Sequence, residues 1–451
     1  MRTLEWLLCL SFVPIVLLPL SPPHWRRRWL LAAAPLPALV TALHLAVEGW
    51  RVQMLPLYTL AALVLAIHLP ALFGRSRPPR RRRGILVSGA AGLALVLGGV
   101  LAGWALPVVE LPPPGGPYAV GLVDRELVDA ARGRRLMASV WYPAARPGAP
   151  APLTRHPAEI AAGLSKLTGL PAPVFQHLRY VNLAASQGAP VLADGGPFPV
   201  LVFSHGMVGL RLQSSPVLQD LASRGYVVVA IDHTDAAAVT VFPDGEARFY
   251  DLGRMGMPAG VEPTTALMDE HVLPAWIADQ RFVYDTIEDW AASDPLLAGR
   301  IDPGRIGSFG HSFGGATALE VCRVDPRCRA AANLDGGLYG GIAREPATRP
   351  LLLMTSAESN RYQEAIDGWA ALIDNAQADA AWLELPGSNH LSFTITQLLS
   401  PILVPAGFDP RAGLATAGAY LGAFFDAHLR GIDSPLLHPQ PGAADVRWRS
   451  P

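Results

Sequence analysis

Long apolar stretches dominate the first 110 residues of the chain. Four of them approach the length of a helix that crosses a bilayer: residues 4–20, 29–47, 54–73 and 85–109. The last one contains no charged residue between Arg83 and Glu110. The first is the weakest candidate, because Glu5 and Pro14 interrupt it and could leave it too short to span. The pattern predicts an all-α transmembrane domain of about four helices over residues 1–110.

After residue 117 the apolar positions follow a different rhythm, in which short β-branched runs alternate with amphipathic stretches. The runs that predict buried strands lie at 198–206, 226–235, 305–309, 330–334, 350–355 and 380–385. Helices are expected between them, near 212–224, 272–292, 313–323, 360–375 and 412–430. Strands that alternate with helices of this length predict an α/β domain built on a mostly parallel sheet.

The remaining segments complete the predicted domain organisation. Prolines and glycines at 111–117 predict an extended linker between the two parts. The α/β domain is expected over 118–435, and its irregular Pro/Ala-rich segment 143–197 could form a cap over a cleft. Residues 436–451 are expected to be a Pro-rich tail.

The charge distribution predicts how the membrane part is oriented. Hydrophobic residues make up 51% of the chain and charged residues 16%, which is too apolar for an ordinary soluble protein. The net charge of −1 conceals an asymmetry, because residues 1–110 carry +8 and the rest carry −9. Arginines cluster at 26–28 and 75–83, and the positive-inside rule places both connections in the cytoplasm. The N-terminus and everything after residue 110 are therefore expected on the extracytoplasmic side of a cell membrane.

The same arginines argue against nucleic acid as a partner, because they lie between apolar segments rather than among aromatic residues. The expected partners are a membrane bilayer and an ester or lipid substrate. Cys9 lies in the first apolar stretch, whereas Cys322 and Cys328 are six residues apart in the α/β domain. No C-x-x-C spacing suggests a metal site. A Cys322–Cys328 disulfide and two buried thiols remain equal alternatives, decided by the redox compartment.

The motif "RIGSFGHSFGGATALE" at 305–320 carries the candidate chemistry. Gly310, Ser312 and Gly314 match G-x-S-x-G between a predicted strand and a predicted helix. In that setting the serine lies on a tight turn at a helix N-terminus, and its neighbours must be small so that strand and helix can approach. The pattern predicts that Ser312 is a nucleophile on a nucleophile elbow.

A serine nucleophile needs a base and a carboxylate that orients the base, in the chain order Ser, acid, His. His390 lies in the loop "LPGSNHLSF" after the last predicted strand and is the expected base. Asp335, at the end of the strand in "AANLDGG", is favoured as the acid over Glu358, which ends the following strand. Asp325 is expected to begin a turn.

The backbone amides of Met207 and Phe313 are candidates for the oxyanion hole, because one follows an early strand and the other follows the serine. Asp232, His233 and Asp235 also end a predicted strand and could bind a metal. Loop structure is the favoured interpretation of these three residues.

The ordered set of motifs resembles the plasma-type (group VII) platelet-activating factor acetylhydrolases. The similar stretches are "GPYAVG", "FPVLVFSHGMVGLR", "IDHTDAAA", "RIGSFGHSFGGAT", "NLDGG" and "GSNHLSF", over roughly 115–435. The resemblance implies an α/β-hydrolase fold, Ser312 as nucleophile, Asp335 as acid and His390 as base, with an oxyanion hole at Met207 and Phe313. The spacing from Ser312 to Asp335 agrees with the family and favours Asp335 further over Glu358. With the apolar N-terminal part, the resemblance implies a bacterial, membrane-anchored member of this family.

We therefore expect a membrane-anchored serine carboxylic-ester hydrolase that releases short acyl groups, acetyl above all, from phospholipid-like esters. The reaction would pass through an acyl-enzyme and would need no metal or cofactor. Alternatives are a broader carboxylesterase or polyester hydrolase, an acyltransferase, and a membrane receptor or scaffold with an inactive hydrolase domain.

Overall fold

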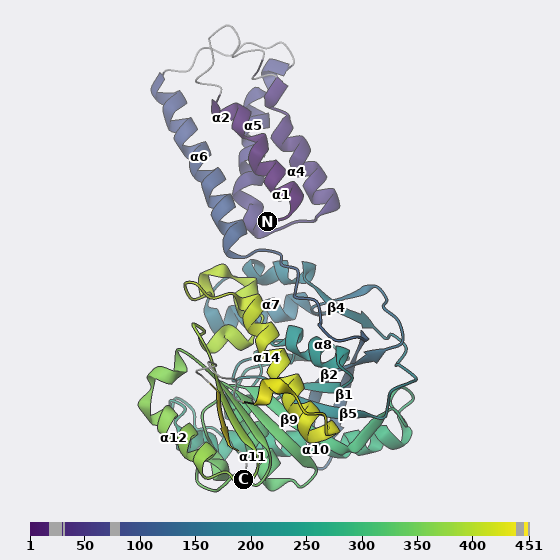
Figure 1. Cartoon of the computed structure of the whole chain (residues 1–451). Coiled ribbons are helices and arrows are strands. Elements are labelled where there is room, and N and C mark those ends of the chain that lie inside the picture. The colour runs from purple at the N-terminus through teal and green to yellow at the C-terminus, as the bar shows by residue number, and fades with distance from the viewer. Residues whose placement is uncertain (18–28, 30–31, 73–81, 439–445, 450–451) are drawn as a thin grey trace. The chain divides into compact units, whose positions relative to one another are not determined.

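The computed structural model describes the chain except for residues 18–28, 30–31, 73–81, 439–445 and 450–451. The chain divides into two compact units. One consists of residues 1–109 together with 171–178 and 399–402, and the other contains the remaining residues. Figure 1 shows a helical unit and a unit built on a sheet.

The helical unit contains the N-terminal apolar stretches. Its helices are α1 (Thr3–Ser11), α2 (Val13–Leu17), α4 (Leu36–Val47), α5 (Leu55–Leu72) and α6 (Arg82–Ala105), with the 3-10 turn η2 (Val52–Met54) before α5. Pro14 lies where α1 gives way to α2, and a turn at Ala34–Pro35 precedes α4. Proline lacks a backbone N–H donor and is favoured in the first turn of a helix. Pro14 and Pro35 therefore divide the apolar stretches 4–20 and 29–47 into shorter helices.

The expectation of four membrane-spanning helices is therefore not supported as stated. Within the described residues, one helical stretch, Val52–Pro70, is long and apolar enough to cross a bilayer. The other apolar helical stretches are shorter than 18 residues: Thr3–Leu17, Leu36–Val47 and Ala90–Ala105, which is the apolar part of α6. Some of the expected features lie outside the described residues. They are the end of segment 4–20, part of the start of segment 29–47, the arginine cluster at 26–28 and most of the cluster at 75–83.

The second unit is organised around one mixed sheet. In its described residues the sheet has 11 strands in the order β13-β12-β11-β10-β9-β5-β6-β2-β1-β4-β3. Neighbouring strands from β12 to β6 are parallel, whereas β2 pairs antiparallel with both β6 and β1. The parallel strands are β5 (Phe198–Ser204), β6 (Val227–Asp232), β9 (Ile301–His311), β10 (Cys328–Leu334), β11 (Leu351–Ser356) and β12 (Ala380–Leu385). All six strands were expected from the sequence, and their carboxyl ends meet at one edge.

The other strands extend or flank this parallel core. They are β1 (Ala119–Asp129), β2 (Arg134–Ala144), β3 (Pro150–Pro152), β4 (Asn182–Gln187) and β13 (Val446–Arg449), with a separate hairpin of β7 (Val239–Val241) and β8 (Ala247–Phe249). Two of them, β3 and β4, come from the segment 143–197, and its suggested role as a cap stays a prediction. Part of the expected C-terminal tail forms the edge strand β13, which pairs with β12.

Helices cover both faces of the sheet. The main ones are α7 (Pro157–Thr168), α8 (Ser215–Ser223), α10 (Leu273–Ser293), α11 (Phe313–Val324), α12 (Gln363–Asp374), α13 (Thr396–Leu399) and α14 (Pro410–Phe425). Shorter helical segments of the same unit are η4 (Leu252–Met255), α9 (Thr265–Leu267), the π-helix η5 (Met268–Val272), η6 (Gly340–Ala343), η7 (Ser359–Arg361), η8 (His390–Phe393), the π-helix η10 (Asp426–Arg430) and η11 (Pro435–Leu437). The turns η3 (Ala172–Tyr180) and η9 (Pro401–Leu403) fall mostly on the residues that belong to the helical unit. Val200 and Val202 of β5 pack into the core with residues of α10 and α11, whereas Leu201 faces Phe425 of α14 across Gly307. Alternate residues of a strand point to opposite faces, so α10 and α11 cover one face and α14 covers the other.

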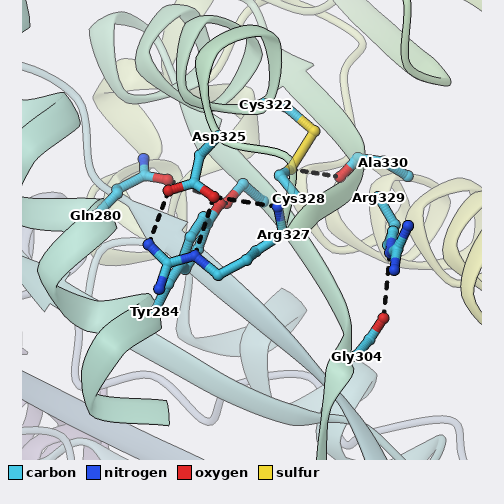
Figure 2. Close-up of a disulfide and its surroundings, with 10 residues drawn as sticks. Gln280, Tyr284, Gly304, Cys322, Asp325, Arg327, Cys328, Arg329 and Ala330 are labelled. Carbon is cyan, nitrogen blue, oxygen red and sulfur yellow. Dashed lines mark hydrogen bonds and ion pairs between the residues drawn. A yellow bond between two sulfur atoms is a disulfide. The ribbon is translucent and has the colours of Figure 1, made fainter. Parts of the chain in front are cut away.

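A disulfide links Cys322, near the end of α11, to Cys328, the first residue of β10 (Figure 2). Both cysteines are buried. Inside the loop that it closes, Arg327 donates hydrogen bonds to Asp325, so Asp325 organises a turn as expected. The disulfide thus joins the far ends of α11 and β10, whose other ends carry Ser312 and Asp335.

Candidate active site

Ser312 lies between β9 and α11 on a backbone turn that few residues adopt. Its φ is 56° and its ψ is −128°, a combination that is strained for a residue other than glycine. The Ser312 N–H donates to the carbonyl of Leu334, and its own carbonyl accepts from Gly315 and Ala316 in the first turn of α11. These bonds hold the strained turn, so the serine is fixed at the N-terminus of the helix.

The glycines around Ser312 are required by close backbone contacts. A Cβ on Gly310 would lie 2.3 Å from the Gly314 carbonyl, and one on Gly314 would lie 2.2 Å from the Ser204 carbonyl. On the acid side, a Cβ on Gly336 would lie 2.1 Å from the Ser312 carbonyl. Real Cβ atoms do not approach backbone this closely, and the strand–turn–helix geometry of G-x-S-x-G therefore depends on these glycines.

Asp335 follows β10 and has a buried carboxylate that accepts four hydrogen bonds. Ser356 donates through its N–H (2.6 Å) and its Oγ (2.9 Å), Ser359 donates through its Oγ (2.9 Å), and His390 Nδ1 lies 2.7 Å from Oδ2. Burial alone would raise the pKa of Asp335, but the bonds from His390 and Ser356 stabilise the anion and lower the pKa below its usual value. The site therefore holds Asp335 as a carboxylate.

His390 begins the short turn η8 and has a partly open side chain, 41% exposed. Its Nδ1 faces Asp335, which leaves Nε2 as the free ring nitrogen that a general base would use. Glu358, the rival acid, accepts the backbone N–H of His390 at 3.2 Å instead of a ring N–H. The structure thus pairs the imidazole with Asp335.

The structure brings Ser312 into the same region as this pair through the residue before it. His311 Nε2 lies 2.8 Å from the His390 carbonyl, and the two rings are 4.5 Å apart between centroids. In the described part of the chain, Ser312 Oγ makes no hydrogen bond to His390. Hydrogen bonds of this kind are often long without substrate, so this geometry is compatible with a nucleophile–base pair.

The candidate oxyanion amides are those of Met207 and Phe313. Among the described residues, neither N–H donates a hydrogen bond to a backbone or side-chain acceptor. Phe313 is the first residue of α11, where backbone N–H groups are free and the helix dipole favours negative charge. Both amides are thus available to a developing oxyanion.

The residues at the end of β6 make structural contacts, as favoured from the sequence. Asp232 pairs with Arg211, and Asp235 pairs with Arg248 at 2.8 Å. His233 donates from Nδ1 to the buried Asp279 at 3.0 Å, and burial lowers the pKa of His233 to about 3. Each of these three side chains thus has a protein partner that orders the loop after β6.

The sequence did not predict the residues that hold Asp335, the loop after it and His311 in place. Ser356 and Ser359 hold Asp335, and Asn333 holds the acid loop by bonding both the N–H and the carbonyl of Gly336. Gln213 contacts His311 and the oxyanion loop, as described below. The serines of "TSAES" were visible as polar residues at a strand end, whereas nothing in the sequence pointed to Gln213.

Comparison with known proteins adds a family match. A family model described as "Platelet-activating factor acetylhydrolase, isoform II" matches residues 105–248 and 290–417, more than half of the chain. The matched ranges include Ser312, Asp335, His390, Met207 and Phe313.

Individual relatives are named as esterases or acetylhydrolases. A probable 1-alkyl-2-acetylglycerophosphocholine esterase of Arthroderma benhamiae is 28% identical over 72% of this chain and 90% of its own length. A platelet-activating factor acetylhydrolase of Cavia porcellus is 27% identical over 54% of this chain, and the match spans only 60% of that protein. A solved ferulic acid esterase from Streptomyces cinnamoneus is 30% identical, with a TM-score of 0.61 over 76% of this chain and 99% of its own. These comparisons agree with the expected enzyme class, a carboxylic ester hydrolase, on an α/β-hydrolase type of sheet.

Proposed function

Since this chain belongs to the family of platelet-activating factor acetylhydrolase, isoform II, we propose that it is a serine esterase that releases short acyl groups from phospholipid-like esters. The observation that carries the proposal is that Ser312 on its strained turn and the hydrogen-bonded pair of His390 and Asp335 lie at the carboxyl ends of parallel strands of one sheet. Ligand sites of parallel α/β sheets lie at this edge.

The proposed reaction has two steps. Ser312 Oγ attacks the ester carbonyl while His390 Nε2 takes its proton, and the imidazolium then gives that proton to the leaving alcohol. Water, deprotonated by His390, attacks the acyl-enzyme and releases the carboxylic acid and the free serine. The amides of Met207 and Phe313 would stabilise the oxyanion in both steps, and Asp335 would hold the Nδ1–H tautomer of His390.

The residues beside the oxyanion amides support a small acyl group. The Phe313 ring packs edge-on against Trp276 and Tyr339, each with centroids 5.0 Å away. Met207 and apolar residues from 250–273, including Met255, pack in the same cluster. Because these side chains fill the space next to Phe313, long acyl chains would need them to move.

We also propose that the helical unit anchors the enzyme in a cell membrane. Its surface carries exposed apolar side chains such as Leu39 (65%), Val47 (69%) and Leu101 (62%), whereas Glu5 and Arg51 are buried and paired. Apolar residues outside and charges inside suit a lipid environment. With one helix passing the length criterion, the number of spans stays a proposal.

The orientation proposed from the arginines gains two supporting observations. Arg51 bonds both Glu5 and the carbonyl of Leu106, so the N-terminus, the α4–α5 connection and the end of α6 meet at one end of the unit. The Cys322–Cys328 disulfide suits an oxidising compartment outside the cytoplasm. The orientation is tested by labelling introduced surface cysteines of the catalytic unit with a membrane-impermeant reagent. Labelling in intact cells is the expected result, and labelling only after lysis would refute the orientation.

The function is tested with the full chain in detergent and a series of acetyl, butyryl and longer glycerophospholipid esters beside aryl and feruloyl esters. We expect acetyl esters to be cleaved fastest, and Ser312→Ala to lower kcat by about 10⁴-fold or more. Full activity in Ser312→Ala would refute the serine mechanism. Preference for feruloyl or long-chain esters would favour the broader carboxylesterase that the ferulic acid esterase likeness suggests.

A further inference from the structure

His311, the residue before the nucleophile, is buried and uses both ring nitrogens. Its Nε2 lies 2.8 Å from the backbone carbonyl of His390, and its Nδ1 lies 3.0 Å from the side-chain nitrogen of Gln213. A carbonyl can only accept and an amide nitrogen can only donate. His311 is therefore the neutral Nε2–H tautomer, which donates to His390 and accepts from Gln213.

Gln213 continues this chain of bonds to the other side of the site. Its Oε1 accepts the N–H of Gly206 at 3.2 Å, directly before Met207. Its backbone carbonyl accepts the N–H of Ile395 at 2.7 Å, in the loop that follows His390. Through two side chains, the oxyanion loop, the nucleophile strand and the base loop are bonded to one another.

The environment keeps His311 uncharged while His390 works. Burial, together with the nearby His390, lowers the pKa of His311 to about 3. The groups that face it are Gln213 from the oxyanion loop, His390 and Phe393 from the base loop, and Asp335 through His390. A neutral ring can hold the base loop without adding a second positive charge beside the imidazolium that forms in each step.

We propose that Gln213 and His311 act together as positioning residues that fix His390 relative to Ser312 and the oxyanion hole. Neither touches the reacting atoms, and the inference rests on the proposed serine esterase function. The side chain of the base is 41% exposed, and among the described residues its ring has one hydrogen-bond partner, Asp335. The His390 backbone is held on both of its polar groups, because its carbonyl accepts from His311 and its N–H donates to Glu358. The bond from His311 comes from the residue next to Ser312, so it links the direction of Nε2 to the position of the nucleophile.

The test compares His311→Phe, His311→Gln and Gln213→Leu in the full chain. The number of folded sites is counted by a fluorophosphonate probe that labels Ser312. Phenylalanine keeps the ring volume and removes both hydrogen bonds, whereas glutamine keeps a donor that can reach the His390 carbonyl. We expect His311→Phe to lower kcat per labelled site by about 10²-fold with little change in KM, because a misplacement of about 1 Å costs that much. His311→Gln should recover most of the loss.

The double variant His311→Phe/Gln213→Leu provides the sharper measurement. If the two side chains act as one bridge, its kcat should be no lower than that of His311→Phe alone, because residues in one network are not additive. His428→Phe is the matched control: this histidine lies in η10 against Phe424, and its replacement should leave kcat unchanged.

Four results would overturn the inference. The first three are an unchanged kcat in His311→Phe, equal losses in His311→Phe and His311→Gln, and losses that multiply in the double variant. A kcat that falls only in proportion to the labelled sites would assign the pair to folding alone and would equally refute it. Failure of the proposed function looks different, because Ser312→Ala would then stay active.

Discussion

Replacing Cys322 and Cys328 by alanine removes the disulfide that closes a short loop between α11 and β10. The native loop has other supports, since Arg327 bonds Asp325 at 2.8 Å and Asp285 at 2.6 Å. We therefore expect the folded structure to persist without the disulfide. The main consequence should be a more flexible unfolded chain.

The size of the effect follows from the length of the loop. The cysteines are six residues apart, and loop-closure entropy for such a ring corresponds to about 2 kcal/mol at 25 °C. For a unit of about 330 residues, that loss of unfolding free energy should lower Tm by about 3 °C. The kcat at 25 °C should change little, because Ser312 and Asp335 lie at the opposite ends of α11 and β10.

The measurement is thermal unfolding of the full chain in detergent, followed by tryptophan fluorescence and by loss of esterase activity. Cys9→Ala is the control, because Cys9 is a free, buried thiol in the helical unit. An unchanged Tm in the Cys322/Cys328 variant would refute the reasoning. A large loss of kcat at 25 °C would show that the disulfide shapes the site itself.

Three further predictions concern the site. Asp335→Asn should lower kcat by about 10⁴-fold, because an amide favours the wrong tautomer of His390. Glu358→Gln should lower kcat far less, since the amide oxygen can still accept the His390 backbone N–H. Equal losses of kcat in the two variants would contradict the assignment of Asp335 as the acid. Gly314→Ala should abolish folding or activity, because its Cβ would lie 2.2 Å from a backbone carbonyl, whereas Gly368→Ala in α12 meets only Leu338 at 3.8 Å and should leave both intact. Ser356→Ala should raise the pKa of Asp335, because it removes one of the bonds that stabilise the carboxylate. The lowered pKa of Asp335 stabilises the folded state at pH values above the usual Asp range, and this stabilisation is lost as the pH falls through the pKa of the folded state. The acid unfolding midpoint of the variant should therefore lie at higher pH, and an unchanged or lower midpoint would contradict this.

The catalytic unit was largely predictable because its signals are local. Buried parallel strands appear as continuous β-branched runs, and each expected strand from 198 to 385 is present within a few residues. The order of Ser312, Asp335 and His390, which follow β9, β10 and β12, could be predicted for the same reason, since parallel strands bring their carboxyl ends to one edge. The structure adds the hydrogen bond between His390 Nδ1 and Asp335, and it shows that Asp335 rather than Glu358 contacts the imidazole.

The helical unit was less predictable because apolarity does not determine where a helix breaks. Residues 4–20 and 29–47 are mostly apolar, but the helices there are interrupted near Pro14 and Pro35. The burial of Glu5 beside Arg51 was also not expected, because a sequence does not distinguish a charged residue that is buried in an ion pair from one that is exposed to solvent. A C-terminal tail that pairs with β12 escaped prediction, because its partner is about 65 residues away.

The sequence by itself determined the α/β pattern, the nucleophile motif and the order of the acid and base, because strand burial and tight turns impose their own residue types over a few positions. Only the tertiary structure decided that Cys322 and Cys328 form a disulfide, which carboxylate contacts the His390 ring, and that Gln213 reaches His311 across 98 residues of chain. These contacts join residues that share no local pattern. Their distances are set by how strands, helices and loops pack.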